Sequence, residues 1–344
     1  MKINVAILGA TGAVGQRFIQ LLENHPVFQI HELVASSRSA GKPYREAAKW
    51  KLATPVPEDV KNKVVLSLDA SLESKILFSG LDSDVAGEAE AAYRSKGHLV
   101  ISNSKNHRMD TDVPLVVPEI NPDHLDLVTR QKSVYGGAIV TNPNCSTIGL
   151  VLGLAPVFDL GIEQAIVSTM QAISGAGYPG LPSFDILDNV IPHIGGEEPK
   201  IEEEPQKIFG TLSGQTILPA TVRTSAMVHR VPALDGHLIA VSLRFKKPAT
   251  REELVSRFTH YTGEPQKLGC YYAPTPPVQY FEAVDRPQTR LDRDLGRGMT
   301  VSVGNLRPCS IFDWKYNILV HNTVRGAAGG TILIAELMVK KGLV

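Results

Sequence analysis

The chain has 344 residues, and its 35 basic and 35 acidic side chains give a formal net charge of zero. At about 150 residues per domain, this length predicts two domains. The balanced charge argues against a nucleic-acid-binding protein and against a polybasic membrane-surface protein. No apolar run approaches the ~20 residues that cross a bilayer. The longest candidate, residues 148–158, contains Gly149, Gly153 and Pro156.

Cysteine usage indicates a reducing environment. The three cysteines, Cys145, Cys270 and Cys309, are far apart and form no C-x-x-C pair, which argues against a disulfide framework and a zinc site. The first residues lack the basic and apolar regions of a secretory signal. We therefore expect a cytoplasmic protein without a bound metal, in which a reduced thiol is available for chemistry.

The first 145 residues alternate strand-like and helix-like segments. Helical spacing of Val14, Phe18 and Leu22 follows the first apolar run, and residues 86–94 are also helix-like. Short apolar runs predict strands at residues 3–8, 31–35, 64–68, 76–78, 99–101 and 138–141. Such alternation predicts a parallel sheet covered by helices on both faces.

The second part of the chain has longer strand-like runs, at residues 165–173, 238–245, 299–306 and 311–320. Helices are predicted at 182–190 and 251–261, and the stretch 273–278 is expected to be a loop. This pattern predicts an α+β domain on a mostly antiparallel or mixed sheet. Residues 326–340 have helical spacing, and we expect them to pack back on the first domain.

A glycine-rich turn, Gly9-Ala10-Thr11-Gly12-Ala13-Val14-Gly15, joins the first predicted strand to the first helix. Small residues there let a phosphate approach backbone N–H groups at the positive end of a helix. The G-x-x-G-x-x-G spacing differs from the common G-x-G-x-x-G, and a glycine turn can be purely structural. Its position in a βαβ unit favours dinucleotide binding by Gly9, Thr11, Gly12, Ala13 and Val14.

The residues after the second predicted strand indicate which dinucleotide the chain binds. They include no carboxylate to accept from ribose hydroxyls, and are Ser36, Ser37, Arg38 and Ser39 instead. Hydroxyls and a guanidinium suit a 2′-phosphate, so we expect NADP(H) rather than NAD(H). The alternative is a polar surface loop, which these residues would also populate.

Cys145 follows a predicted strand and precedes an apolar helix, within Asn142-Pro143-Asn144-Cys145-Ser146-Thr147. Asn144 suits the N-cap position, so the thiol would lie in the first turn, where the helix dipole and free N–H groups lower its pKa. The alternative is an inert buried cysteine, which is the default for Cys270 and Cys309.

A dinucleotide and a reactive thiol together predict that the sulfur carries an acyl group as a thioester during a redox reaction. Such a mechanism needs an acid/base near the sulfur, most often a histidine. His237 opens a strand-like run after the turn Asp235-Gly236, so Arg230 and His237 are expected on neighbouring strands that face one pocket. The alternative is a solvated or structural histidine.

Several motifs in the chain resemble the aspartate-β-semialdehyde dehydrogenase family, most closely its archaeal and fungal branch. They are the glycine turn, residues 102–108, 142–147, 171–177 and 204–207, Arg230 with His237, and residues 322–327. The resemblance covers essentially the whole chain. It implies an α/β fold with a Rossmann-like NADP-binding domain, 1–144 and 325–344, and an α+β catalytic and dimerisation domain with a mixed sheet, 145–324.

The activity that this resemblance implies is the NADPH-dependent reductive dephosphorylation of L-aspartyl-4-phosphate to L-aspartate-4-semialdehyde. That reaction lies on the route to lysine, methionine, threonine and isoleucine. The implied partners are the small-molecule substrate, phosphate and further copies of the chain in a homodimer or homotetramer, with no nucleic acid and no membrane.

The resemblance also implies a role for each matching residue. Cys145 would be the nucleophile, His237 the acid/base, and Gln171 would orient the substrate near the sulfur. Arg230 would bind the α-carboxylate, Glu204 the α-ammonium, and Arg108 with Lys207 the phosphate, beside Asn144. From the residues alone, Glu204 and Lys207 fit a solvated helix face. The cofactor would further contact Ser79, Gly80, Ser174, Gly175, Ala176, Gly177, Asn322 and Thr323.

Two acyl reductases of the same superfamily are the nearest alternatives. Malonyl-CoA reductase shares the segment 174–180, but its cysteine follows Pro-Leu, whereas Cys145 follows Pro143-Asn144. In N-acetylglutamyl-phosphate reductase the corresponding loop is Asn-Pro-Gly-Cys. A non-catalytic NADP-binding sensor would lack the nucleophile or the base, and this chain has both Cys145 and His237.

Overall fold

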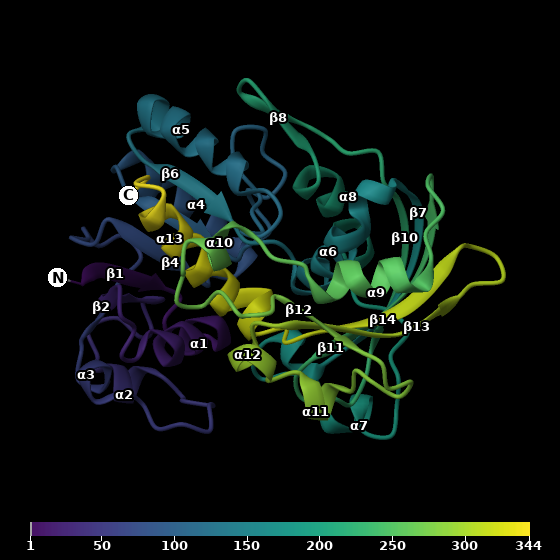
Figure 1. The fold of residues 1–344 in the computed structure, drawn as a ribbon. Helices are drawn as coiled ribbons and strands as arrows, with labels where there is room; N and C mark the ends of the chain where they lie inside the picture. Colours follow the sequence, from purple (N-terminus) through teal and green to yellow (C-terminus); the bar gives the residue numbers. More distant parts are fainter. Residues whose placement is uncertain (1) are drawn as a thin grey trace.

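The computed structural model describes residues 2–344, which form two lobes, each built on a six-stranded sheet (Figure 1). The first sheet has the strand order β3-β2-β1-β4-β5-β6, and all its strands are parallel. They are β1 (Ile3–Leu8), β2 (Phe28–Val34), β3 (Val65–Leu66), β4 (Ile76–Ser79), β5 (Leu99–Ser102) and β6 (Ala138–Thr141). The predicted parallel sheet is confirmed.

Helices cover both faces of this sheet because successive residues of its central strands are apolar, which makes both faces apolar. Val5 and Ile7 of β1 pack with Phe18 of α1 (Ala13–Leu22). The intervening residues Ala6 and Leu8 pack on the other face, with Tyr93 of α4 (Ser83–Ser95). Strand order reverses between β1 and β4, and in sheets of this kind the ligand crevice lies at the carboxyl ends of the two strands that flank such a reversal.

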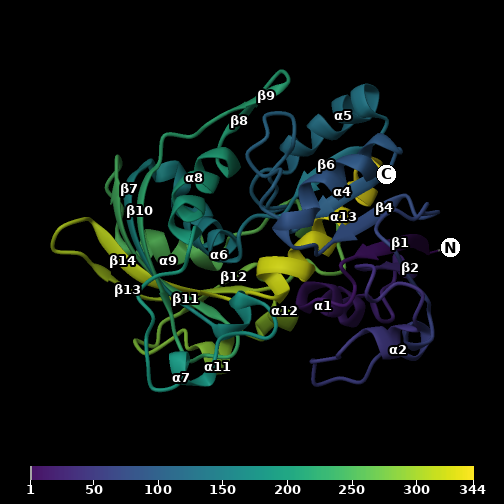
Figure 2. The same ribbon diagram turned by 180° about the vertical axis from the view of Figure 1, so that it is seen from behind.

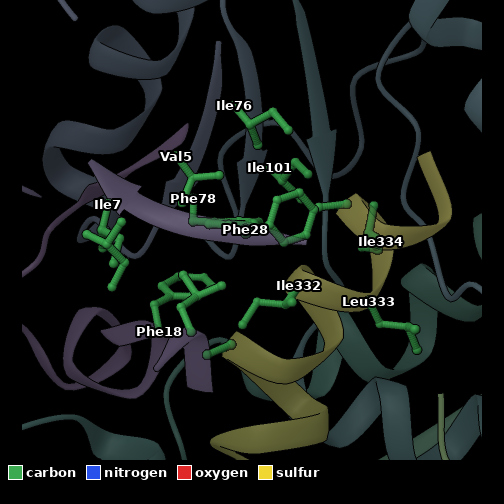
Figure 3. Packing of buried hydrophobic residues seen from close by; sticks show 14 of the residues in the cluster. Val5, Ile7, Phe18, Phe28, Ile76, Phe78, Ile101, Ile332, Leu333 and Ile334 are labelled. Atoms are coloured by element: carbon green, nitrogen blue, oxygen red, sulfur yellow. The ribbon is translucent and has the colours of Figure 1, made fainter. Parts of the chain in front are cut away.

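The C-terminal segment returns to the first sheet, as predicted. A π-helical turn, η4 (Val324–Ala328), leads into α13 (Gly329–Lys340). Figure 3 shows Ile332, Leu333 and Ile334 of α13 beside the buried side chains of the first sheet and α1. Residues 329–338 are all buried, as expected for a helix that is apolar on every side.

The second sheet is mixed, with the order β10-β7-β11-β14-β13-β12. The pairs β7–β10 and β12–β13 are parallel, and the others are antiparallel, so the predicted mixed sheet is confirmed. Helices α6 (Cys145–Leu154), α8 (Glu197–Ile208) and α9 (Arg251–Thr259) pack against this sheet (Figure 2). The strands are β7 (Ile162–Gln171), β10 (Arg223–Arg230), β11 (His237–Phe245), β12 (Val278–Phe281), β13 (Val301–Pro308) and β14 (Trp314–Val320).

Two glycines set the position of α6 on this sheet. A Cβ on Gly149 would lie 2.6 Å from Cγ1 of Val320, and one on Gly153 would lie 2.4 Å from Cδ1 of Ile318. Both contacts are shorter than carbon atoms allow, so only glycine lets α6 lie this close to β14. The close approach brings the N-terminus of α6, with Cys145, to the junction between the two lobes.

The predicted helix at 182–190 is largely wrong. Only α7 (Ser183–Ile186) is helical; Ile186 is buried, but Phe184 is 99% exposed, so little apolar packing supports a longer helix. Asp188 has a positive φ of 56°, which ends any helix there. The strand β10 was not predicted, because consecutive polar residues at both of its ends, 223–225 and 229–230, interrupt the alternation of polar and apolar residues, and it lies at the edge of its sheet. The predicted loop 273–278 ends where β12 begins.

The smaller elements join these layers. None of the helices in residues 2–344 is long and apolar enough to cross a membrane. The remaining helices are α2 (Tyr44–Ala47), α3 (Glu58–Lys61), α5 (Leu127–Tyr135), α10 (Glu264–Lys267), α11 (Thr289–Asp292) and α12 (Leu295–Gly298), and β8 (Thr211–Ser213) with β9 (Thr216–Leu218) forms a hairpin.

Candidate active site

Three strand ends meet at one edge of the second sheet and carry three predicted site residues. Gln171 ends β7 and pairs in register with Arg230, which ends β10. His237 begins β11, which runs antiparallel to β7. Because β7 lies between β10 and β11, Arg230 and His237 are not on neighbouring strands, and that prediction is wrong. They lie near one another because the antiparallel β11 starts where the parallel strands end.

Cys145 is the first residue of α6 and lies against His237. The Sγ atom is 3.2 Å from Nε2 of His237. Asn144 caps the helix as predicted, since its Oδ1 accepts from the N–H groups of Ser146 and Thr147 at 2.9 and 3.2 Å. The nucleophile predicted from one part of the chain is thus brought to the acid/base predicted from another.

A backbone contact orients the His237 ring. The N–H of Ala172 donates to Nδ1 at 3.0 Å. A ring nitrogen that accepts a hydrogen bond carries no proton, so the proton of the neutral ring is on Nε2, which faces Sγ. The Nε2–H group of His237 therefore donates a hydrogen bond to the sulfur of Cys145.

The expected lowering of the Cys145 pKa is wrong for the free protein. Burial of the sulfur, with the negative charge of Glu197, raises the pKa of Cys145 to about 12, although Arg108, Arg230 and Lys200 oppose this. Burial and the charge of Arg230 lower the pKa of His237 to about 3. Desolvation is the largest cause of both shifts, so the pair is neutral until a ligand changes the charge around it.

Glu197 and Lys200, in the first turn of α8, belong to this site and were missed from the sequence. Oε2 of Glu197 accepts from Nδ2 of Asn144 at 2.9 Å and from Nε2 of Gln171 at 3.4 Å, and Lys200 Nζ lies 2.6 Å from Oε1. Burial raises the pKa of Glu197, but Lys200 and these hydrogen bonds hold it below its usual value. A charged carboxylate therefore lies beside Gln171 and the helix cap.

Glu204 and Lys207, one to two turns further along α8, have partners within the protein. The carboxylate of Glu204 accepts from Nη1 of Arg108 at 2.9 Å and from the N–H of Asn144 at 2.8 Å. Nζ of Lys207 donates to the carbonyls of Arg108, Asp110 and Val113, each at 2.7 Å. These contacts disagree with the expectation that Glu204 and Lys207 bind substrate charges, because both groups are buried and already paired.

Arg108 and Arg230 keep unused donors. Arg108 donates from Nη2 to the carbonyl of Asn103 at 2.7 Å, while its buried Nε has no hydrogen-bond partner within residues 2–344. Arg230 donates from Nη1 to the carbonyl of Ala172 at 2.8 Å. A guanidinium has five N–H donors, so both side chains can also bind an anion.

The crevice of the first sheet fits a dinucleotide. A Cβ on Gly9 would lie 2.7 Å from the carbonyl oxygen of Gly80, and one on Gly15 would lie 2.2 Å from that of Gly9. The glycine turn therefore packs directly between β1 and β4, where α1 begins. This is the place at which a parallel sheet of this order binds a pyrophosphate.

The predicted 2′-phosphate site is an exposed turn directly after β2. Ser36, Ser37 and Arg38 are exposed, and Ser39 is half-buried. Lys42 Nζ donates to the carbonyl of Arg38 at 3.0 Å, which adds a second cation to the turn. The hydroxyl of Ser79, in contrast, is buried and donates to Glu90 at 2.6 Å. The side chain of Ser79 is therefore not free to bind the cofactor, and the backbone next to Gly80 borders the crevice instead.

The loop 174–177 reaches the same pocket from the second lobe. A Cβ on Gly175 would lie 2.7 Å from Nη1 of Arg230 and 3.2 Å from Cε1 of His237. Asn322 holds this loop, because its Nδ2 donates to Oγ of Ser174 at 2.8 Å and its Oδ1 accepts from the N–H of Gly236. Across the part of the chain that the structure describes, the buried Oγ1 of Thr323 has no partner, which suits a polar ligand.

Comparison with known proteins agrees with this arrangement. The family model described as the NAD binding domain of semialdehyde dehydrogenase matches residues 4–128, and the one described as its dimerisation domain matches residues 154–325. The chain is 50% identical to the aspartate-semialdehyde dehydrogenase of Schizosaccharomyces pombe, covering 98% of each, and 47% identical to that of Archaeoglobus fulgidus, covering 100% of each. The crystal structure of the Candida albicans enzyme with NADP superposes with a TM-score of 0.93 at 43% identity, covering 100% of both chains.

Proposed function

This chain belongs to the aspartate-semialdehyde dehydrogenase family, and we propose that it catalyses the NADPH-dependent reduction of L-aspartyl-4-phosphate to L-aspartate-4-semialdehyde and phosphate. The contact between Sγ of Cys145 and Nε2 of His237, at 3.2 Å, is the observation that carries the proposal. It supplies a nucleophile and a proton donor at one point, with cations on several sides.

Cys145 performs the covalent step. Its sulfur attacks the acyl carbon, a C–S bond forms, and the C–O bond to phosphate breaks to leave a thioester, while the thiol proton leaves with the departing phosphate. NADPH, when bound, would supply the hydride that reduces the acyl group. His237 holds its proton on Nε2, toward the sulfur, and is placed to donate a hydrogen bond to the substrate oxygen while that oxygen is negative. When the aldehyde leaves, the released thiolate takes up a proton from water.

The charges of the pocket complement the substrate, with a revised assignment of two residues. We assign Arg230 to the α-carboxylate and Glu197 to the α-ammonium. Arg108 and Lys200 are assigned to the phosphate, since Lys207 is used within the protein. Gln171 and Asn144 support Glu197 through their side-chain amides.

NADP(H) is assigned to the crevice between β1 and β4. The N–H groups of the glycine turn, at Gly9, Thr11, Gly12, Ala13 and Val14, would hold its phosphates, and the turn 36–39 its 2′-phosphate. Gly80 borders the crevice, and Ser174, Gly175, Ala176, Gly177, Asn322 and Thr323 lie on the side of Cys145. The two lobes, which we divide at 1–144 with 325–344 and 145–324, would thus enclose the reacting atoms between them.

Consumption of NADPH with different acyl donors tests the activity. We expect turnover with L-aspartyl-4-phosphate, and none with malonyl-CoA or N-acetylglutamyl phosphate. Turnover with either of the last two alone would contradict the proposal. The reverse reaction, from the semialdehyde, phosphate and NADP⁺, provides the same test with a stable substrate.

We further propose that the chain self-associates as a homodimer or homotetramer. The family model of the second lobe is that of a dimerisation domain. The second sheet leaves Ile166 and Met227 46% and 63% exposed, as a face that a second copy would cover. Sedimentation of the wild type and of Met227→Lys tests this, and a monomeric wild type would contradict it.

A thiol nucleophile supports the further proposal of a cytoplasmic location, where thiols stay reduced.

A further inference from the structure

Two ionic side chains of α8, Glu204 and Lys207, connect the lobes without facing the pocket. Glu204 is 2% exposed and Lys207 is 7% exposed. They are one turn apart on α8, which belongs to the second lobe, yet both contact the segment around Arg108, which belongs to the first. Burying two ionic groups costs free energy unless each finds hydrogen-bond partners within the protein. The partners of Glu204 and Lys207 therefore indicate the role of these two side chains.

Glu204 joins two parts of the site. One carboxylate oxygen accepts from Nη1 of Arg108 at 2.9 Å, and the other accepts from the backbone N–H of Asn144 at 2.8 Å. Asn144 immediately precedes the nucleophile. One side chain therefore holds both the guanidinium assigned to the phosphate and the start of the helix that carries Cys145.

Lys207 holds the same loop by its backbone. Its three N–H donors each reach one carbonyl, those of Arg108, Asp110 and Val113, at 2.7 Å. An ammonium has three donors, so none is left for a ligand. Arg108 is thus held at its side chain by Glu204 and at its main chain by Lys207.

We infer that Glu204 and Lys207 are positioning residues, which fix Arg108 relative to Cys145 so that the phosphate subsite and the sulfur keep a set separation. The inference rests on the proposed function, because it assumes that Arg108 binds phosphate. Neither residue touches the substrate. A displacement of about 1 Å at such a site lowers the rate about 100-fold, because reacting groups must be aligned.

The test uses the full-length protein and the reverse reaction, with phosphate as the varied substrate. For Glu204→Gln and for Lys207→Met we expect the KM for phosphate to rise at least tenfold and kcat to fall. The KM for the semialdehyde should stay within threefold. Glu203→Gln, a change at an exposed residue of the same helix, should match the wild type within twofold.

A second substrate separates positioning from direct binding. Succinate semialdehyde lacks the α-ammonium group. If Glu204 positions Arg108, Glu204→Gln lowers kcat/KM by the same factor for both aldehydes, whereas Glu197→Gln reduces the preference for the amino substrate. If Glu204→Gln reduces that preference instead, Glu204 binds the ammonium and the inference is overturned.

Non-additivity gives a third measurement. In an Arg108→Ala background, Glu204→Gln and Lys207→Met should add less than twofold to the KM for phosphate, and a full additional effect would overturn the inference. If Glu204→Gln does not fold, as judged by NADP⁺ binding, Lys207→Met decides through the same KM, and an unchanged value refutes positioning. A wild type that is inactive in the reverse reaction would refute the proposed function instead.

Discussion

The buried pair of Arg325 and Glu119 allows a quantitative prediction about stability. Arg325 is in η4, and Glu119 precedes the second lobe. Their side chains are 1% and 0% exposed, and they form two hydrogen bonds, one of them 2.9 Å from Nη1 to Oε1. Gln266 also donates to Oε1, at 3.2 Å. Glu119→Gln keeps the shape of the side chain but leaves the guanidinium charge buried without its counter-charge.

Removing one partner of a buried ion pair costs about 3–5 kcal/mol. Unfolding entropy of about 2.1 cal/mol/K per residue gives about 0.7 kcal/mol per degree for a chain of this length, so about 4 kcal/mol lowers Tm by about 6 °C. Urea denaturation and calorimetry at one protein concentration measure both quantities. Activity should fall as well, because a Cβ on the next residue, Gly326, would lie 2.8 Å from Cβ of Cys145.

The matched control is Glu282→Gln in the surface pair with Arg251, whose side chains are 64% and 40% exposed. It should cost less than about 1 kcal/mol. The double variant Glu119→Leu/Arg325→Met should recover most of the stability, since it removes the buried charge altogether. A Glu119→Gln protein within about 1 kcal/mol of the wild type would refute this reasoning.

Three further predictions concern the pocket. Cys145→Ala should abolish turnover but leave NADP⁺ binding, measured by titration, within about threefold; an active Cys145→Ala protein would exclude the covalent step. Arg38→Ala should raise the KM for NADPH about tenfold and leave that for NADH unchanged, because a charged hydrogen bond contributes about 1.5–3 kcal/mol; equal effects on both would contradict the 2′-phosphate assignment. His237 has a folded pKa of about 3 against 6.5 when unfolded, so the unfolded chain binds the extra proton between these values and stability falls as pH falls. The slope is up to about 1.4 kcal/mol per pH unit, and urea titrations from pH 6 to 4 should show a shallower dependence for His237→Gln.

Much of the fold follows from local patterns in the sequence. The apolar runs of the first lobe are buried on both faces, so they show as continuous strands, and α6 and α13 are apolar on all sides for the same reason. The glycine turn and the Asn144 cap depend only on residues that are neighbours in the sequence, so local motifs predict both. Predictions were wrong where burial is one-sided or absent, as in β10 and at 182–190.

The charged part of the site required the tertiary structure. Glu197 with Lys200 and Glu204 with Lys207 repeat the same acid–base spacing seven residues apart, so both pairs lie on nearly the same face of α8. The local sequence therefore does not indicate which of the two pairs faces the pocket. Only the packing of α8 against the segment around Arg108 decides that the second pair is enclosed and the first borders Gln171 and the cap of the nucleophile helix.

The sequence by itself determined the residue types proposed for the chemistry, which are a cysteine at a helix start, a histidine and a glycine-rich turn, because each depends on short-range geometry. The tertiary structure decided their protonation and partners. Burial reversed the expected shift of the Cys145 pKa, and the packing of α6 against β11 placed His237 against the sulfur. These effects depend on desolvation and on how a helix packs against a sheet, which are properties of the folded chain as a whole.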